Sequence, residues 1–178
     1  MANFFRRAFN LFYYIILMQS LMGLTNFLPN ISISNRIRGF ILRPFFGGCG
    51  KRFQIARGAI INVPRNIFIG NDVYIAHDVW INGSGGLSIG HNVIVSPKVV
   101  IATTRHGYES GSVQLRKSHV GPIKIGDGSW VASNCTITMG VSIGKGCIIG
   151  ACSCVTKDIL DYTLAGGVPA VAIKSLSK

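Results

Sequence analysis

The feature that most constrains this chain is an aliphatic residue that returns every six positions over most of its length. From Ile125 to Leu160 the repeat is unbroken and reads IGDGSW, VASNCT, ITMGVS, IGKGCI, IGACSC, VTKDIL. Earlier blocks follow the same scheme from Ile55 onward, with two shifts of two residues before IATTRH. Ile, Val or Leu heads each full block, and the fifth place is usually small or Val. The heading aliphatic of each block is predicted to point inward.

A period of six does not match an α-helix, because a helix would lose this register after two blocks. It fits short strands joined by tight turns, with pairs such as Gly70-Asn71 and Gly126-Asp127 supplying the turn torsions. Three blocks would form a triangular coil of about 18 residues, and successive coils would stack roughly 4.8 Å apart. A single coil cannot bury its aliphatic residues alone. A β-sandwich of short strands, the alternative, does not explain the sustained six-residue phase.

The repeat stops within IATTRHGYES and resumes at IKIGDGSWV, which leaves residues 103–122 as an interruption. Because a stacked coil is smooth and closed, a loop that leaves it is free to build a pocket. His106 lies where the coil is left, and an imidazole with a pKa near neutrality suits the removal of a proton from a hydroxyl. His119 is a rival in the same loop, and Glu109 could orient His106. The alternative for each is a solvated surface position.

The first third of the chain carries the excess of positive charge. Up to Arg65 there are nine basic residues and no acidic one, within a net charge of +12. This bias indicates an anionic partner, but no motif of a nucleic-acid-binding fold accompanies it, so nucleic acid is not expected. The uncharged stretch from Ala8 to Pro29 predicts a helix that packs on its own domain or a neighbouring subunit, lies in a membrane surface, or spans the membrane. NRIRGFILRPFF predicts a second, short helix.

The five cysteines, an odd number with no cleavable signal, predict reduced thiols and a cytoplasmic protein. Cys135 and Cys147 take equivalent places of the repeat, where a small buried hydrophobe is expected. Cys152 and Cys154 have no histidine near them at the spacing of a zinc site, so no metal is expected.

The blocks resemble the hexapeptide repeat of the left-handed parallel β-helix acyltransferases. The resemblance covers roughly residues 53–174, and the segment from IGDGSW to AGGVPAVAIK is similar to the family's closing segment nearly block by block. It implies an all-β fold: a left-handed parallel β-helix of about five coils over residues 53–160, with loop 103–122 protruding as the active-site loop. Residues 1–52 would form a basic, apolar helical segment, and residues 161–178 a C-terminal tail.

The resemblance also implies an activity. The members most similar to this chain acetylate sugars, including residues of bacterial surface polysaccharides, and acetyl-CoA is the donor. In the family, a histidine at the place of His106, here in the sequence TTRHG, is the catalytic base. The cofactor lies in a groove between two subunits of a homotrimer, so the chain is expected to form one.

Residues at the family's cofactor-binding positions are present. The matching residues are Ser133, Ala151, Thr156 and Lys157, and the lysine of this VTKD motif can meet a cofactor phosphate. In addition, Trp130 matches a tryptophan kept beside the pantetheine arm, although a packing role at a corner is the alternative. The tail sequence GGVPA resembles the family's turn near the adenine, and Lys174 would add positive charge there.

One departure from the family concerns the acceptor. Sugar-binding relatives often carry Asn at the place of Ala76 in the IAHDVW block, so the site of a simple galactoside or maltose acetyltransferase is not expected. Asp78 and Asn82 are the residues expected to contact the acceptor.

Metal catalysis is the less favoured use of the same fold. His77 and His91 occupy third places of their blocks, which tend to face solvent, and they would be ligands only in a γ-class carbonic anhydrase. That class needs a histidine pair five residues apart in one coil, whereas His106 and His119 are thirteen apart.

The sequence thus predicts a cytoplasmic O-acetyltransferase that moves acetyl from acetyl-CoA to a sugar hydroxyl during synthesis of a capsule, O-antigen or exopolysaccharide. Residues 1–44 would hold it peripherally at the inner face of the cytoplasmic membrane, near lipid-linked acceptors. Two alternatives stay open. One is an acetyltransferase for another small acceptor, such as the amine of a nucleotide sugar, serine or a drug. The other is a β-helix that serves as a scaffold without catalysis.

Overall fold

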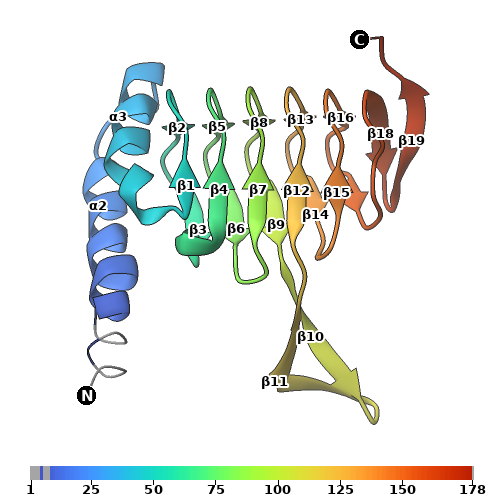
Figure 1. Ribbon diagram of the computed structural model, residues 1–178, viewed down its shortest axis with the longest axis horizontal. Coiled ribbons are helices and arrows are strands. Elements are labelled where there is room, and N and C mark those ends of the chain that lie inside the picture. Colours follow the sequence, from blue (N-terminus) through green and yellow to red (C-terminus); the bar gives the residue numbers. More distant parts are fainter. Residues whose placement is uncertain (1–4, 6–8, 178) are drawn as a thin grey trace.

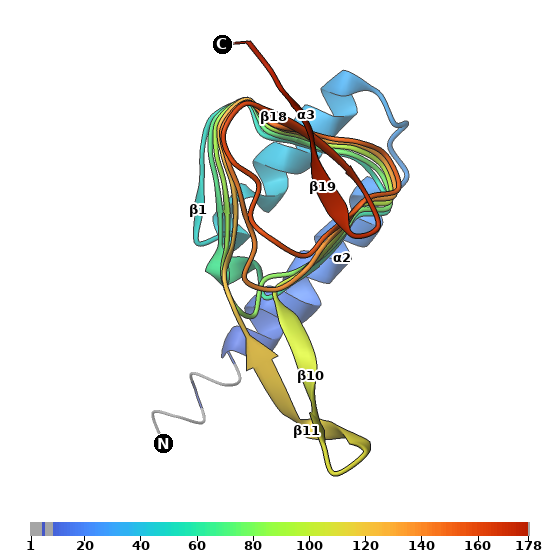
Figure 2. The same ribbon diagram turned by 90° about the vertical axis from the view of Figure 1, so that its right-hand side faces the viewer.

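The computed structural model describes residue 5 and residues 9–177, and most of this chain winds into a solenoid of triangular cross-section (Figures 1 and 2). Sheet A contains β1 (Gly48–Cys49), β4 (Ile67–Ile69), β7 (Leu87–Ile89), β12 (Ile123–Ile125) and β15 (Ser142–Ile143). Sheet B contains β2 (Gln54–Ile55), β5 (Tyr74–Ile75), β8 (Ile94–Val95), β13 (Trp130–Val131), β16 (Ile148–Ile149) and β18 (Thr163–Gly167), with β19 (Ala170–Ser175) antiparallel at its edge. Sheet C contains β3 (Ile60–Asn62), β6 (Trp80–Asn82), β9 (Val100–Ala102), β14 (Thr136–Ile137) and β17 (Cys154–Val155).

The solenoid is left-handed. In Figure 2, seen from the C-terminal end, the chain passes from β1 on the left to β18 at the top and round to the start of β10 below. It therefore turns clockwise while it comes toward the viewer, which is the left-handed sense. The expected left-handed parallel β-helix is confirmed, and its sheets carry five or six parallel strands where about five coils were predicted.

The aliphatic residues that head the blocks stack into three buried columns. Register places Cys49, Ile69, Ile89, Ile125 and Ile143 in sheet A, Ile55, Ile75, Val95, Val131 and Ile149 in sheet B, and Ile61, Ile81, Ile101, Ile137 and Val155 in sheet C. Except for the half-buried Cys49 in the first coil, every member of these columns is buried. The inward orientation predicted from the repeat is confirmed.

The two-residue shifts in the early repeat have a structural cause. Ile55, Ile75 and Val95 are register partners, so each early coil takes 20 residues, more than the predicted 18. The extra length lies at the corner between sheets C and A, because Ile61 and Ile69 are eight positions apart whereas Ile137 and Ile143 are six apart. Beyond this corner a further buried column in sheet A contains Ile67, Leu87 and Ile123. The later coils, such as the one from Val131 to Ile149, take 18 residues as predicted.

All five cysteines are free thiols. Cys135 and Cys147 are fully buried at the places that the repeat predicts, and burial raises the pKa of both thiols. Burial also raises the pKa of the Cys49 thiol, to about 11. These three thiols therefore stay protonated near neutrality and act as small core residues.

Helices cover the N-terminal end of the solenoid (Figure 1). A π-helix, η1 (Leu11–Leu17), leads into α2 (Met18–Thr25), and α3 (Ser32–Leu42) is followed by the 3₁₀ turn η2 (Arg43–Phe45). A second 3₁₀ turn, η3 (Pro64–Asn66), lies between β3 and β4. Met18, Leu42 and Phe45 of the helical segment are buried in one core with Phe53 of the first coil, so the helices pack on their own domain. None of the described helices has the length and apolar character needed to cross a membrane.

A long β-hairpin forms the protruding loop expected at residues 103–122. Its strands, β10 (Thr104–Glu109) and β11 (Ser112–Val120), pair antiparallel between the end of β9 and the start of β12. Figures 1 and 2 both show this hairpin extending away from the body of the solenoid at the corner between sheets C and A.

Candidate functional site

His106 lies at an irregularity of the hairpin. It pairs with Ser118, and the register of the two strands shifts between His106 and Gly107. Such a bulge bends a strand and redirects its side chains, and bulges are frequent beside active sites. The imidazole of His106 is exposed in the single chain. The interruption of the repeat thus presents a histidine on an arm that projects from the rigid coils.

His119, the rival histidine, lies on the other face of the hairpin. It pairs with Arg105, the residue before His106. Because cross-strand partners share a face and successive residues alternate, His119 and His106 point to opposite sides. Glu109 pairs with Ser112 beyond the bulge, near the tip of the hairpin.

Thr103 fixes the base of the hairpin. Its side chain is fully buried, and its Oγ1 donates to the carbonyl oxygen of Asn82 (2.6 Å) and accepts the N–H of Gly85 (2.8 Å). The carbonyl oxygen of Thr103 accepts the N–H of Gly121 (3.0 Å), which follows β11. One residue therefore ties both ends of the hairpin to the preceding coil.

Asn82, predicted to contact the acceptor, belongs to the same base. Its Oδ1 accepts the N–H of Ser84 (2.9 Å), and its Nδ2 donates to Oγ1 of Thr104 (3.3 Å). The structure therefore brings Asn82 together with the hairpin of His106, and in this chain its amide positions the loop.

Most of the predicted cofactor residues gather along sheet B and at the corner between sheets B and C. Ser133 and Ala151 are stacked there, since the N–H of Cys152 reaches the Ser133 carbonyl oxygen (2.9 Å). The indole N–H of Trp130, on sheet B, donates to Oγ of Ser96 at this corner (2.7 Å). Lys174 lies in line with Trp130, because register joins Trp130 to Ile148, Ile148 to Leu164, and Leu164 to Lys174.

Asp78, the other predicted acceptor residue, lies at the corner between sheets B and C and not beside Asn82. It adopts a left-handed conformation (φ 59°), like Lys98, Asn134 and Cys152 in the turns that follow. Asp78 and Asn82 are four positions apart, and in a three-sided coil that step spans one whole face, here the strand β6.

Thr156 and Lys157 follow β17 and lie at the corner between sheets C and A, two coils beyond the departure of the hairpin. The predicted residues therefore form two groups, one at each end of the strands of sheet C. The loop corner holds Asn82, His106, Thr156 and Lys157, and the cofactor corner holds Asp78, Trp130, Ser133 and Ala151. A single chain does not bring His106 to Trp130.

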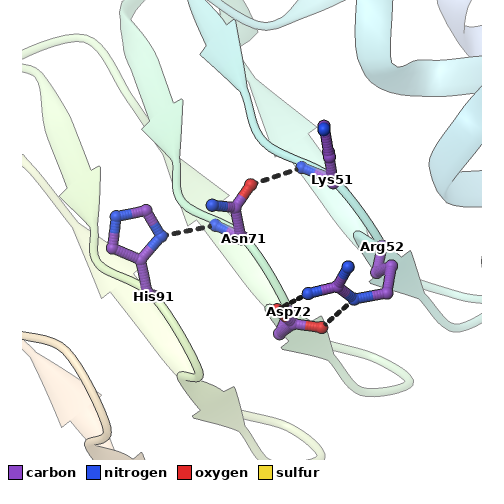
Figure 3. Close-up of polar contacts among 5 residues, drawn as sticks. All are labelled: Lys51, Arg52, Asn71, Asp72 and His91. Carbon is purple, nitrogen blue, oxygen red and sulfur yellow. Dashed lines mark hydrogen bonds and ion pairs between the residues drawn. The ribbon is translucent and has the colours of Figure 1, made fainter.

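His91 has a structural partner (Figure 3). Its Nδ1 accepts the backbone N–H of Asn71 (2.9 Å), and the Asn71 side chain accepts the N–H of Lys51 in the coil before (2.7 Å). Asp127 continues this ladder by accepting the N–H of His91 (2.8 Å). His91 thus takes a turn-stabilising place that Asn or Asp fills in other coils.

The described residues contain no cluster suited to a metal ion, and the large groove of the solenoid lies apart from the two groups. Within the part of the chain that the structure describes, no three His, Cys, Asp or Glu side chains gather closely enough to hold a metal ion. A groove of about 1110 Å³ runs along sheet A past Phe68, Lys124 and Lys145, and none of the predicted site residues lines it.

Sequence reasoning missed Ser96 and the anchoring role of Thr103. Ser96 contacts Trp130 across 34 residues of sequence, a distance at which a repeat indicates register but not hydrogen bonds. Thr103 does carry a signal, since it stands where the period of six is first broken.

Comparison with known proteins agrees with this architecture. Residues 122–157 match the family model described as bacterial transferase hexapeptide (six repeats). Galactoside O-acetyltransferase of Escherichia coli K12 is 32% identical over 143 residues, covering 79% of this chain and 69% of the relative. WcaF of the same strain, named as an acetyltransferase of colanic acid biosynthesis, is 31% identical over 139 residues, covering 78% and 75%.

A solved structure extends the likeness beyond the repeat. The hexapeptide-repeat acetyltransferase of Vibrio cholerae O1 biovar eltor, complexed with acetyl coenzyme A, superposes with a TM-score of 0.78 at 27% identity. The match covers 95% of this chain and 92% of that one, so it includes the N-terminal helices and the hairpin as well as the coils. With these relatives, the six-residue repeat and the left-handed solenoid, this chain belongs to the hexapeptide-repeat acetyltransferases.

Proposed function

We propose that this acetyltransferase transfers the acetyl group of acetyl-CoA to a sugar hydroxyl of a bacterial surface polysaccharide or its precursor. The observation that carries the proposal is the hairpin, which leaves the solenoid where the repeat breaks and presents His106 at a bulge. The sugar acceptor is supported by the galactoside and colanic acid relatives, and the donor by the neighbour complexed with acetyl coenzyme A.

In this mechanism His106 acts as the general base. Its imidazole removes the proton of the acceptor hydroxyl while the hydroxyl oxygen attacks the carbonyl carbon of the thioester. The C–S bond then breaks, CoA leaves as the thiolate, and the proton passes from the imidazolium to the sulfur. The products are the O-acetylated sugar and CoA. The residues proposed to hold the cofactor are Trp130, Ser133, Ala151, Thr156, Lys157 and Lys174.

A homotrimer would complete the site. Within one chain the loop corner and the cofactor corner lie at opposite ends of the strands of sheet C. Three prisms around a common axis can place the loop corner of one subunit against the cofactor corner of the next. His106 would then meet acetyl-CoA held by a neighbour.

The proposal also places the protein at the cytoplasmic side of the membrane, with residues 1–44 in peripheral contact near lipid-linked acceptors. The nine basic residues up to Arg65, unaccompanied by any acidic residue, support this location.

The direct test is acceptor-dependent release of CoA. The purified full chain is incubated with acetyl-CoA and a panel of galactosides, polysaccharide repeat units, amino-sugar nucleotides and serine. Saturable release with a hydroxyl-bearing sugar is the expected result. A preference for the amines would replace the acceptor class, and failure of acetyl-CoA to shift the melting temperature would favour a scaffold without catalysis.

Subunit complementation tests the shared site. We expect His106→Ala and Ala151→Trp to be inactive alone, since the first removes the base and the second fills the exposed cofactor corner. After co-expression in equal amounts, random trimers should regain about a quarter of the sites, because hairpin and corner come from different chains. Co-assembly is verified by differently tagged subunits. No recovered activity in verified mixed trimers would place the whole site within one chain.

Thr103→Val tests the anchoring of the hairpin. Valine keeps the shape of threonine but loses both Oγ1 hydrogen bonds. The Gly85 N–H is then left unsatisfied, and the Asn82 carbonyl oxygen keeps only the longer bond from the Thr103 N–H (3.3 Å). We expect kcat to fall by about tenfold, since a displaced His106 acts poorly even when the fold survives. Thr138→Val is the matched control, because Oγ1 of Thr138 also donates to a backbone carbonyl, that of Val155, but anchors no loop. Equal kcat losses in both variants would contradict the anchoring role.

A further inference from the structure

The helix α3 exposes its apolar face and buries its polar one. Its outward positions, spaced i, i+3, i+4, i+7, are Ile33, Arg36, Ile37 and Phe40. Ile33 is 64% exposed and Phe40 is 76% exposed. The inward positions, all buried, are Ser34, Asn35, Arg38, Gly39 and Leu42. A surface helix of a soluble domain normally has the opposite arrangement.

The buried polar face is held in place by specific contacts. The guanidinium of Arg38 donates to the carbonyl oxygens of Thr25 (3.0 Å) and Leu28 (2.6 Å), at and just after the end of α2, and to Oδ1 of Asn35 (2.8 Å). Of these acceptors, the Thr25 carbonyl is the last of α2 and has no partner within that helix, and the Leu28 carbonyl lies in the segment that follows it. A rotation of α3 that buried Phe40 would break the bonds from Arg38 to Thr25 and Leu28, so the exposure of the apolar stripe belongs to the fold.

Gly39 adds a steric reason. A Cβ at this position would lie 2.2 Å from the carbonyl oxygen of Phe53 in the first coil. Only this face of α3 can approach the solenoid so closely. The opposite face is therefore directed away from the coils.

The apolar surface continues beyond α3. Between α2 and α3, Phe27 is 90% exposed, and Leu24 and Ile31 are also exposed. We define the N-terminal apolar face as Leu24, Phe27, Ile31, Ile33, Ile37 and Phe40. In Figure 1 the two helices lie across the N-terminal end of the solenoid, far from β18 and β19 at the other end. Exposed apolar side chains gathered on one segment of the chain indicate a binding surface.

Cations surround this face. Arg36, Arg43 and Arg52 line a hollow of about 160 Å³ beside Phe40, and all three are exposed. Arg52 pairs with Asp72, which is the first acidic residue of the chain. Asp72 also interacts electrostatically with Arg36, so one carboxylate faces three arginines and the surface keeps an excess of positive charge.

We propose that the N-terminal apolar face docks on the surface of an anionic lipid bilayer. Ile33, Ile37 and Phe40 would enter the headgroup boundary, and Arg36 and Arg43 would contact lipid phosphates. This sharpens the membrane contact proposed for residues 1–44, and it does not depend on the acetyl-transfer chemistry.

The charge pattern favours a bilayer over a second copy of the chain. If two copies joined face to face through this surface, Arg36 and Arg43 would meet their own counterparts, with no carboxylate of the same segment between them. An anionic bilayer supplies the missing negative charge together with the apolar phase. In a threefold assembly with parallel coil axes, the three faces would lie at one end and bind the same surface together.

Vesicle flotation tests the proposal. The full chain is mixed with vesicles of phosphatidylglycerol and phosphatidylcholine, or of phosphatidylcholine alone, at fixed salt. We expect binding to the anionic vesicles only. Phe40→Glu should weaken it by roughly tenfold or more, because an apolar anchor is lost and a repelled charge is gained. Arg36→Gln should weaken it by about fivefold, which corresponds to about 1 kcal/mol for one basic contact.

Leu160→Glu is the matched control, since Leu160 is 81% exposed and lies between β17, the last strand of sheet C, and β18. It introduces the same charge and should leave vesicle binding unchanged. Absence of binding to anionic vesicles, or an equal loss in Leu160→Glu, would overturn the proposal. So would a lower oligomeric mass of Phe40→Glu by light scattering, because the face would then join copies of the chain. CoA release with a water-soluble acceptor is measured in parallel, so a failure here is separable from a failure of the proposed activity.

Discussion

Replacing His106 with alanine is expected to lower kcat/KM for acetyl transfer by about 10²–10⁴-fold, the range that general-base catalysis contributes. The fold should survive, because the imidazole is exposed on β10 and the hairpin is anchored through Thr103 instead. CoA release is measured with the acceptor identified by the panel, and circular dichroism and light scattering verify secondary structure and mass.

His119→Ala is the control for this prediction. His119 lies in the same hairpin but faces the opposite side, beside Arg105. Its removal should change the rate by no more than about threefold, since it cannot reach the same reacting atom as His106. Undiminished turnover in His106→Ala would remove the assignment of the base. Comparable losses in both variants would mean that the shape of the hairpin matters and that neither imidazole removes the proton.

The period of six was sufficient to predict the solenoid. A strict repeat indicates which residues point inward, and the heading positions from Ile55 to Val155 are buried as expected. It also predicts where the coil is left, so the protruding loop could be located at residues 103–122. The difference in coil length, 20 residues early and 18 later, was visible as two-residue shifts but needed the strand register to be explained.

The site was less predictable, because it depends on which corner each residue occupies. Asp78 and Asn82 are close in sequence, but they lie at opposite ends of β6, at different corners of the coil. The roles of Thr103 and Ser96 rest on hydrogen bonds between coils, which a repeat does not encode. The inverted faces of α3 could not be predicted for a similar reason. The hydrogen bonds that hold the buried Arg38 go to carbonyl oxygens of Thr25 and Leu28, which lie outside α3.

The second large effect concerns the small residue at the second place of each block. In Gly126→Ala, the new Cβ would lie 2.5 Å from the carbonyl carbon of Gly144 in the next coil, closer than packed atoms allow. The obstacle is backbone, and it is held in register by the bond from the Gly126 N–H to the Ile143 carbonyl oxygen (2.8 Å). The coils would have to separate locally, so we expect a loss of about 2–4 kcal/mol in the free energy of unfolding. The melting temperature, measured at fixed protein concentration, should fall by roughly 5–15 °C.

Gly128→Ala separates this stacking effect from backbone strain. Gly128 has a positive φ of 69°, which disfavours alanine, but its new Cβ would meet nothing within 4 Å. We expect a loss of about 1 kcal/mol, the usual cost of a left-handed residue with a side chain. If stacking distance is what selects glycine at the second place, Gly126→Ala must be the more destabilising of the two. A larger loss in Gly128→Ala would show that turn conformation, and not the contact between coils, sets the glycine pattern of the repeat.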